Sequence, residues 1–381
     1  ADVPRLEAAS GCTDDGAFGD GPASKDFITY YRSQCFFGTC DGGTDGDVAP
    51  AAEYDALWRT LRAPLPVTVV VDARHASVME PRLQAEGWRR RTEFDRAGLS
   101  VWELDSESYT SAKKAWAERE NRRGRITFQE LVSLVPALLL APSQDQLCLD
   151  LCSAPGNKSV QLLRALEAAS TPSRPLAGAV LSGELDAQRC CIVLPRQLSK
   201  AHSPASCGAL ANAQNFPALV DDASAEKVAF ERILVDVPCS GDGTARKNIQ
   251  IWSSWKRREA LQLFSRQRNI LMRALILLPP GGLCVYSTCS LNPIENEAVV
   301  LAALRRWHKE ERLDGVSIEL LDARDACARV CDLRCDAGIT SWRVPSPERG
   351  GPLYEDFGEV PQELRFGSDT SQGCKCLLRP D

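Results

Sequence analysis

Residues 147–169, LCLDLCSAPGNKSVQLLRALEAA, connect a short apolar segment to an amphipathic segment through a loop of small residues. LCLDL is typical of a buried strand, and SVQLLRALEAA has the apolar spacing of a helix. Small side chains in the loop allow the backbone to approach a ligand closely, and the first turn of the helix offers free N–H groups. This strand–loop–helix unit therefore predicts a ligand site at the carboxyl end of a parallel strand.

The same alternation of strand and helix continues toward the C-terminus. Strands are predicted at residues 178–185, 232–238 and 281–290, and helices at residues 187–200, about 259–278 and 293–307. Elements that alternate at this spacing form parallel sheets with helices on both faces. We therefore expect an α/β fold with a mostly parallel sheet.

The N-terminal part of the chain has a different character. Residues 1–50 are rich in Gly, Asp and Ala, and we expect a poorly structured acidic segment with one short helix near residues 27–33. Residues 51–125 begin with a helix, a β-branched strand and a second helix, which predicts a small α/β module. Its last part, residues 111–125, is interpreted as a solvated basic connector. Residues 126–381 are assigned to the main domain, which opens with a helix whose predicted N-cap is Thr127.

Composition limits the class of protein. The 381 residues are 44% hydrophobic and 25% charged, and no apolar run reaches the roughly 18 residues that span a bilayer, so we expect no membrane association. Sixteen cysteines are too dilute here for a disulfide framework, which favours reduced thiols inside the cell. The net charge of −6 argues mildly against a nucleic-acid partner. Residues 245–273, however, hold eight basic residues and one acidic residue, and local charge decides phosphate binding.

Two cysteines follow two of the predicted strands. Cys239 lies in DVPCSGDGT, residues 236–244, and Cys289 lies in YSTCSLNP, residues 286–293. One cysteine is more often a small buried apolar residue than a nucleophile, but two at strand ends, each flanked by small residues and Pro, are difficult to explain by packing. A thiolate that adds to carbon 6 of cytosine activates carbon 5 for methylation. Asp236, three residues before Cys239, could contact ring nitrogen 3 and the exocyclic amine.

Three segments carry a family resemblance. LDLCSAPGNKS (149–159), ILVDVPCSGDGTARKN (233–248) and YSTCSLNPIENEAVV (286–300) resemble the first, fourth and sixth motifs of the Sun-domain (Fmu-type) RNA cytosine-5 methyltransferases. RKN followed by IWSSWKRRE resembles the eukaryotic tRNA-methylating branch. The resemblance implies a Rossmann-like class I methyltransferase fold and S-adenosyl-L-methionine as the cofactor. It implies RNA as the substrate, with tRNA as the favoured RNA, and a role for the module of residues 51–125 in positioning that RNA. It also implies residence in the nucleus or the cytoplasm, with the nucleus favoured.

The resemblance implies roles for individual residues. Cys289, in Thr-Cys, would be the nucleophile, and Cys239, in Pro-Cys, would help the covalent adduct to break down. Asp236 and Lys158 would also serve catalysis, with Lys158 reaching the target base. The cofactor-binding residues would be Cys152, Ser153, Ala154, Pro155, Gly156, Asn157, Lys158, Glu184, Asn212 and Asp236.

Two of these residues need separate comment. Glu184 ends a predicted strand, where a carboxylate can accept hydrogen bonds from both ribose hydroxyls. Asn212 stands where the family usually has Asp near the adenine. An amide can still donate and accept there, so we expect weaker or altered cofactor contacts rather than their loss.

Two alternative functions stay open at this stage. DNA cytosine-5 methylation uses the same thiolate addition, but its nucleophile belongs to a Pro-Cys motif, which would leave Thr288-Cys289 unexplained. A catalytically impaired RNA-binding scaffold would keep the methyltransferase fold, and Asn212 is compatible with it. The short N-terminal module and the ending at CKCLLRPD are also compatible with a scaffold. Both features also suggest that the chain is a fragment of a longer protein.

The tryptophans after the Cys239 loop offer a candidate RNA surface. Trp252 and Trp255, beside three basic residues at 256–258, are interpreted as stacking and phosphate contacts, and the alternative is a helix whose tryptophans pack inside. Near the C-terminus the spacings Cys331-x3-Cys335 and Cys374-x-Cys376 lack regular CxxC pairing, so we expect no metal. No feature indicates an obligate protein partner, and we expect a monomer.

Overall fold

The computed structural model describes residues 25–34, 51–310, 315–332, 335, 338–339, 342–348, 351–354, 359 and 361. Its largest sheet has five strands: β5 (Leu147–Asp150), β6 (Ala179–Glu184), β7 (Ser206–Leu210), β8 (Arg232–Asp236) and β9 (Leu283–Ser287). Their order is β7-β6-β5-β8-β9, and every neighbouring pair is parallel. The chain order reverses between β5 and β8, so the ligand crevice of a doubly wound sheet falls there.

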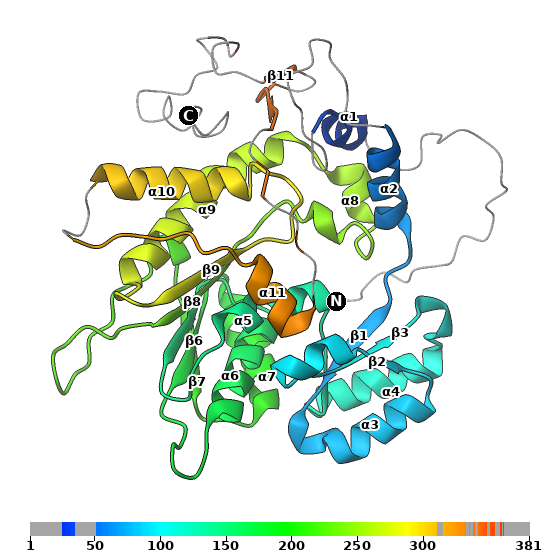
Figure 1. Cartoon of the computed structure of the whole chain (residues 1–381), viewed down its shortest axis with the longest axis vertical. Coiled ribbons are helices and arrows are strands. Elements are labelled where there is room, and N and C mark those ends of the chain that lie inside the picture. Colours follow the sequence, from blue (N-terminus) through cyan, green and yellow to red (C-terminus); the bar gives the residue numbers. More distant parts are fainter. Residues whose placement is uncertain are drawn as a thin grey trace.

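Helices cover both faces of this sheet (Figure 1). Helices α5 (Leu131–Leu140), α6 (Asn157–Ala169) and α7 (Leu194–Leu198) pack against Cys148 and Leu234. On the opposite face, α9 (Arg258–Leu277) packs against Leu149, Ile233 and Val235. Helix α10 (Glu297–Glu310) lies on α9. Alternate residues of each strand point to opposite faces of the sheet and pack in two separate cores. The parallel sheet with helices on both faces confirms the predicted α/β fold.

Sequence analysis missed strand β7 and simplified the helix before it. β7 is an edge strand, and its sequence SCGAL is short and half-exposed, so it lacks the apolar run of a central strand. The helix predicted at 187–200 is a π-helical turn at Arg189–Val193 followed by α7.

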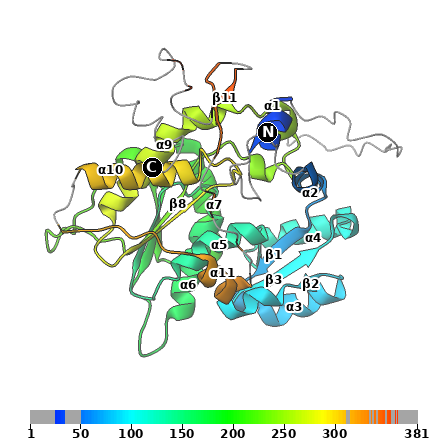
Figure 2. The ribbon, with the colours of Figure 1, turned by 45° about the horizontal axis from the view of Figure 1, so that its top comes forward.

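The N-terminal module forms a second, antiparallel sheet of order β2-β3-β1-β4, from β1 (Val67–Val71), β2 (Arg89–Arg90), β3 (Ser100–Leu104) and β4 (Ile126–Phe128). Helix α3 (Ala76–Ala85) covers it together with α4 (Ser111–Arg122) (Figure 2). The interpretation of residues 111–125 as a solvated connector was wrong, because α4 buries Trp116 and Ala117 in the core of the module.

The predicted N-cap at Thr127 was also wrong. Thr127 lies in β4, opposite Val70, and Glu130 is the N-cap of α5. The apolar pattern there was read as one helix because a three-residue strand is too short to show its own period. Strand β4 pairs with β1, so the sheet of the module extends past the boundary drawn at residue 125.

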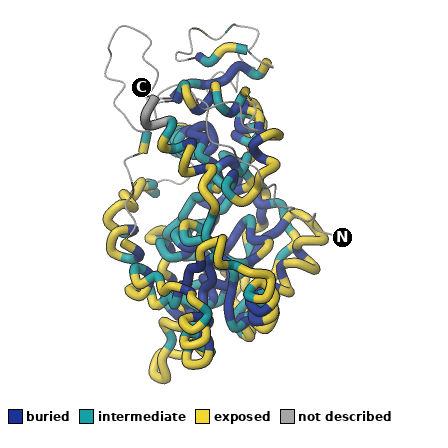
Figure 3. The backbone as a smooth tube through the Cα atoms, turned by 90° about the vertical axis from the view of Figure 1, so that its right-hand side faces the viewer, coloured by how far each residue is buried: buried dark blue, intermediate teal, exposed yellow. Residues whose placement is uncertain are grey.

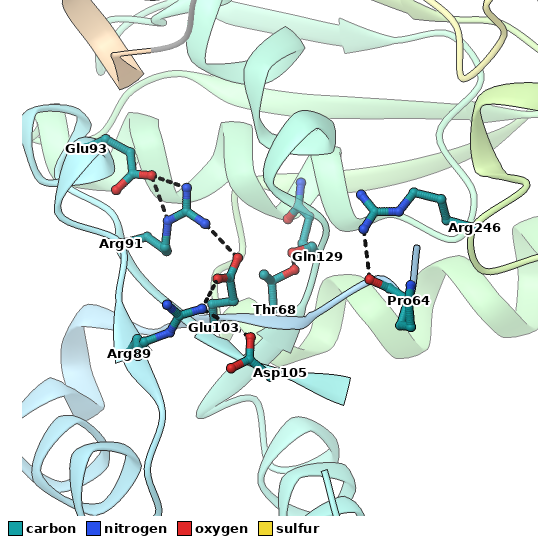
Figure 4. Close-up of polar contacts among 9 residues, drawn as sticks. All are labelled: Pro64, Thr68, Arg89, Arg91, Glu93, Glu103, Asp105, Gln129 and Arg246. Atoms are coloured by element: carbon teal, nitrogen blue, oxygen red, sulfur yellow. Dashed lines mark hydrogen bonds and ion pairs between the residues drawn. The ribbon is translucent and has the colours of Figure 1, made fainter. Parts of the chain in front are cut away.

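Polar contacts hold the module together and join it to the main domain (Figure 4). Within the sheet, the buried carboxylate of Glu103 pairs with Arg89 at 3.0 Å and with Arg91 at 2.6 Å. At the junction, Arg246 donates hydrogen bonds to the carbonyl groups of Ala63 and Pro64 at 3.0 and 2.8 Å. Because Arg246 follows the Cys239 loop, the position of the module is coupled to that loop.

Helices α1 (Lys25–Ser33), α2 (Ala51–Arg62) and α8 (Gln250–Ser254) come together near the top of the main domain (Figure 1). The short helix predicted near residues 27–33 is confirmed by α1. These elements share an aromatic cluster that comprises Phe27, Tyr30, Tyr31, Trp58, Trp252 and Trp255. Figure 3 shows buried residues in the interior of the molecule and exposed residues mainly along its outside.

The C-terminal part of the described chain adds small elements. Helix α11 (Arg324–Cys331) packs near α5, and β10 (Val344–Pro345) pairs with β11 (Leu353–Tyr354). None of the helices in the described residues is both long enough and apolar enough to cross a membrane.

Candidate active site

Acidic and polar side chains end four neighbouring strands at one edge of the sheet. Asp150, Glu184 and Asp236 are the last residues of β5, β6 and β8, and Ser287 is the last residue of β9. Carboxyl ends of parallel strands share one edge, so these side chains face the same crevice. Ser287 Oγ donates a hydrogen bond to Asp236 Oδ1 at 2.7 Å.

The loop after β5 is shaped for close approach of a ligand. Gly156 has φ of 108° and precedes the first turn of α6. A Cβ atom there would lie 2.9 Å from Leu194 Cδ1, so both the backbone angle and the space require glycine. Ser153 donates from its main-chain N–H and from its hydroxyl to the carbonyl of Gly183, each at 2.9 Å. The loop is therefore tied to β6 while its backbone remains at the crevice.

Three carboxyl groups surround Cys152 in this loop. Burial and the nearby Asp150, Glu184 and Asp236 raise the pKa of the Cys152 thiol, so this cysteine stays neutral. Asp150 is fully buried, which raises its pKa to about 7, and it accepts a hydrogen bond from Ser159 Oγ at 2.7 Å. A crevice lined by carboxylates favours a ligand that carries positive charge.

The two predicted cysteines lie in contact. Cys239 Sγ and Cys289 Sγ are 3.2 Å apart, although 50 positions separate them in the chain. The hydrogen bond from Cys239 lowers the pKa of Cys289, and Lys247 acts in the same direction. The hydrogen bond to Cys289, burial and nearby Glu295 raise the pKa of Cys239. Burial, Asp236 and Asp242 act in the opposite direction on Cys289, so the contact with Cys239 is the main reason why Cys289 is the more readily ionised thiol.

Glu295, which sequence analysis did not single out, joins the two cysteine loops. It is fully buried and accepts hydrogen bonds from Ser240 N and Ser240 Oγ at 2.9 and 2.5 Å. It also accepts from Ser290 Oγ at 2.8 Å and from Gln267 Nε2 at 3.0 Å. Ser240 and Ser290 each follow one of the cysteines, so one carboxylate fixes both. The only signal in the sequence was an acidic residue in NPIENE shortly after Thr-Cys.

The backbones of the two loops also interlock. Gly243 N donates to the carbonyl of Cys289 at 3.0 Å, and a Cβ at this position would lie 2.8 Å from that oxygen. The buried Asp242 accepts from Leu291 N at 2.7 Å. Burial raises the pKa of Asp242 to about 6. These contacts explain why the predicted loops carry GDG and SLN directly after their cysteines.

The other residues predicted from the sequence for the cofactor loop lie at the same edge of the sheet, but their side chains make different contacts. Lys158 Nζ forms an ion pair with Asp236 Oδ2 at 2.8 Å. The side chain of Asn157 instead bonds to the carbonyl of Phe128 and to Gln197, so only its backbone is oriented toward the loop. Ala154 and Pro155 contribute backbone, and Arg189 donates to the carbonyl of Ala154.

Glu184 ends β6, and Asn212 follows the neighbouring strand β7 by two residues. Ala211 N donates to the carbonyl of Glu184 at 2.9 Å, which brings the residue after β7 next to the end of β6. The Glu184 side chain accepts from Asp186 N at 2.9 Å. Asn212 Oδ1 accepts from Gln214 N at 3.0 Å and caps a short 3-10 turn, so this oxygen holds the local backbone.

The interpretation of Trp252 and Trp255 as an RNA-stacking surface was wrong. Their exposed fractions are only 7% and 2%, and both pack against Phe27 of α1. Arg257 is also buried, and it pairs with Asp26 at 2.8 Å. The spacing of aromatic and basic residues could not show that α1 covers them.

Cysteine, histidine and carboxylate groups of the described residues form no cluster of three that could hold a metal ion. Cys374 and Cys376, which were considered as zinc ligands, lie outside the described residues.

A parallel sheet with its cofactor-type loop after β5 and a pair of thiols at the same edge defines a Rossmann-like class I methyltransferase. A solved structure of a methyltransferase homologue from Pyrococcus horikoshii shares this fold, with a TM-score of 0.50 and 24% identity over 65% of this chain and 72% of that one. Residues 137–326 match the family described as 16S rRNA methyltransferase RsmB/F.

Two curated relatives are more similar in sequence. The tRNA (cytosine(34)-C(5))-methyltransferase of Drosophila melanogaster is 40% identical over 64% of this chain and 32% of its own length. The multisite-specific tRNA:(cytosine-C(5))-methyltransferase of Saccharomyces cerevisiae is 35% identical over 77% of this chain and 45% of its own length. The chain thus spans less than half the length of these two relatives.

Proposed function

We propose that this protein is an S-adenosyl-L-methionine-dependent RNA (cytosine-5) methyltransferase that acts on tRNA. The observation that carries the proposal is the contact between Cys239 and Cys289 at the cofactor edge of the sheet. The family of residues 137–326 and the names of the two tRNA-methylating relatives support the choice of RNA and of tRNA.

The residues at the sheet edge fit the cofactor. S-adenosyl-L-methionine carries positive charge at its sulfonium and ammonium groups, and it would supply the methyl group. Glu184 and Asp236 provide matching negative charge near the loop of residues 152–156. Glu184 would hold the ribose, and Asn212, two residues after the neighbouring strand β7, would lie beside the adenine.

Cys289 would act as the nucleophile. Its sulfur, as a thiolate, forms a bond to carbon 6 of the cytosine, and electron density moves toward carbon 5 and ring nitrogen 3. The contact with Cys239 lowers the pKa of Cys289, which favours the thiolate that this step requires. A base inside a duplex would not reach this thiol, so the cytosine must be unstacked or flipped out.

Asp236 and Lys158 would hold the ring of the base. The Asp236 carboxylate can accept a hydrogen bond from the exocyclic amine, and the Lys158 ammonium beside it can donate to the ring as negative charge develops there. After methylation, water acting as a base takes the proton from carbon 5, the electrons of that bond re-form the double bond between carbons 5 and 6, and the Cys289 sulfur leaves as a thiolate. Cys239, in contact with that sulfur, would assist this release.

The DNA alternative assigns the nucleophile to Cys239 instead. The raised pKa of Cys239 argues against this assignment, because a neutral thiol is a poor nucleophile. The scaffold alternative requires a defective site. The two thiols lie in contact, and Asp236 and Lys158 form an ion pair at the same edge of the sheet, which favours an active enzyme.

Methyl transfer from radiolabelled S-adenosyl-L-methionine to tRNA tests the proposal, with an equimolar cytosine-containing DNA duplex as the competing substrate. We expect label in tRNA, located by bisulfite sequencing, and none in DNA. Label in DNA alone would overturn the RNA assignment. No label together with no heat of cofactor binding at millimolar concentration would favour the scaffold. Residence in the nucleus stays a prediction, which a fluorescent fusion of the full-length protein can check.

A further inference from the structure

Helix α1 contacts both cysteine loops through two adjacent tyrosines. Tyr30 OH donates a hydrogen bond to Asn292 Oδ1 at 2.7 Å, and Tyr31 OH donates to Asp242 Oδ2. Asp242 lies three residues after Cys239, and Asn292 lies three residues after Cys289. Each thiol loop is therefore held at the same offset from its cysteine by a hydroxyl group of α1.

These contacts are shielded from water. Tyr30, Tyr31, Asp242 and Asn292 have exposed fractions of at most 2%. Loss of either hydroxyl group removes a donor from a buried acceptor that water does not reach, which costs more than loss of a surface hydrogen bond. The acceptors also hold the loop backbone, because Asp242 Oδ1 accepts from Leu291 N and Asn292 Oδ1 accepts from Ile294 N at 3.1 Å.

Helix α1 is itself fixed at both ends. Asp26 near its start pairs with Arg257 at 2.8 Å and also accepts from Arg257 N, at the beginning of α9. Just after its last turn, Gln34 exchanges two hydrogen bonds with the backbone of Arg343, at 2.9 and 3.0 Å. Phe27 packs between these ends in the aromatic cluster. The tyrosine hydroxyls therefore project from a rigid support.

We propose, on the basis of the function proposed above, that Tyr30 and Tyr31 are positioning residues that hold the two thiols together at one target base. They act through Asn292 and Asp242. Helix α1 lies far from residues 137–326 in the sequence. Part of the active-site geometry would therefore depend on a segment outside the region that matches the family.

The test compares Tyr30→Phe and Tyr31→Phe with Tyr354→Phe. Tyr354 is buried in the core that α9 and α10 share and serves as the matched control. Each substitution removes one hydroxyl group and keeps the ring. We expect kcat for tRNA methylation to fall about five- to tenfold in Tyr30→Phe and in Tyr31→Phe, with KM for tRNA and the cofactor affinity within twofold of wild type. Tyr354→Phe should match wild type.

A second readout does not depend on methylation. Diamide takes up the two hydrogen atoms that Cys239 and Cys289 lose when a bond forms between their sulfurs, and peptide mass spectrometry measures the rate. Two thiols in contact should react rapidly, and we expect a rate lower by about fivefold in the Tyr30 and Tyr31 variants. Both assays are run well below the melting temperature of each variant.

The outcomes separate the two proposals. If wild-type protein does not methylate tRNA, the proposed function fails, and the diamide rates alone decide the positioning role. If both rates in the Tyr30 and Tyr31 variants stay within twofold of wild type while only the melting temperature falls, the hydroxyl groups are merely structural and the inference is overturned.

Discussion

Glu295 accepts hydrogen bonds from both the main-chain N–H and the hydroxyl group of Ser240, the residue that follows Cys239. The same carboxylate accepts from the hydroxyl of Ser290, the residue that follows Cys289. One buried side chain thus sets the relative position of two loops that come from different strands. The geometry of the thiol pair depends on residues that never touch the substrate.

Glu295→Gln should therefore impair turnover. The amide nitrogen of Gln is a donor, so it would face either the hydroxyl groups of Ser240 and Ser290 or the Ser240 N–H and Gln267, and those donors would lose their acceptor. We expect kcat for tRNA methylation to fall at least about tenfold, with cofactor affinity within twofold of wild type. Glu297→Gln, on the next turn and in contact with Ile339 N, is the control. Equal kcat in the two variants would contradict the bridging role.

The two cysteines should differ when each is replaced by alanine. Cys289→Ala should abolish turnover and form no covalent protein–RNA species, because the attacking sulfur is gone. Cys239→Ala should still attack but release slowly, so an adduct should accumulate on denaturing gels. The roles assigned here are reversed if Cys239→Ala eliminates the adduct and Cys289→Ala keeps it.

The reactivity of Cys289 should depend on Cys239. The hydrogen bond from Cys239 is the largest cause of the lowered pKa of Cys289, while burial and the carboxylates of Asp236 and Asp242 oppose it. Without that donor, in Cys239→Ala, the pKa of Cys289 should rise, and alkylation by iodoacetamide at neutral pH should slow. Peptide mass spectrometry across a pH series measures this, with the exposed Cys191 as the internal reference. An unchanged pH profile would show that the thiol contact does not tune Cys289.

Asp150 should make the protein less stable as pH rises. Its pKa is about 7 in the folded state, against about 3.9 in an unfolded chain. Between these values the unfolded state loses its proton first, so stability falls with rising pH by at most about 4 kcal/mol. Asp150→Asn should remove this part of the slope between pH 5 and 8 in urea unfolding. A slope identical to wild type would argue that Asp150 is ionised when folded.

The tryptophans after the Cys239 loop should matter for stability rather than for RNA binding. Trp255→Ala removes a side chain that is 2% exposed, and we expect a loss of about 3–5 kcal/mol in the free energy of unfolding. Trp255→Phe should lose less and leave tRNA affinity within twofold of wild type. A selective loss of tRNA affinity in Trp255→Phe, at unchanged stability, would restore the stacking interpretation.

The elements that sequence analysis predicted are those with a local pattern. The strand before Cys152, the loop around Gly156 and the helix after it follow from apolar spacing and small residues within one short segment. Cys239 and Cys289 could be placed at a common edge because carboxyl ends of parallel strands meet there. The edge strand β7 and the short strand β4 carried too few residues to show a period.

What could not be predicted depends on contacts between distant segments. Nothing near Glu295 indicates that it will meet Ser240, and nothing near Trp252 indicates that Phe27 will cover it. Helix α4 was missed because its many charged residues hide the buried side of Trp116 and Ala117. These features depend on tertiary packing, which local patterns do not encode.

The contacts of α1 also have a consequence for biosynthesis. Tyr31 and Asp242 are 211 positions apart, and Tyr30 and Asn292 are 262 positions apart. At roughly 5–20 residues per second, a ribosome needs about ten seconds to nearly a minute to produce the chain between them. During this time the aromatic side chains of α1 stay exposed, because the segments that cover them have not yet left the ribosome. An unfinished chain therefore lacks the assembled thiol pair, and chaperones that bind exposed aromatic segments have a defined interval in which to act.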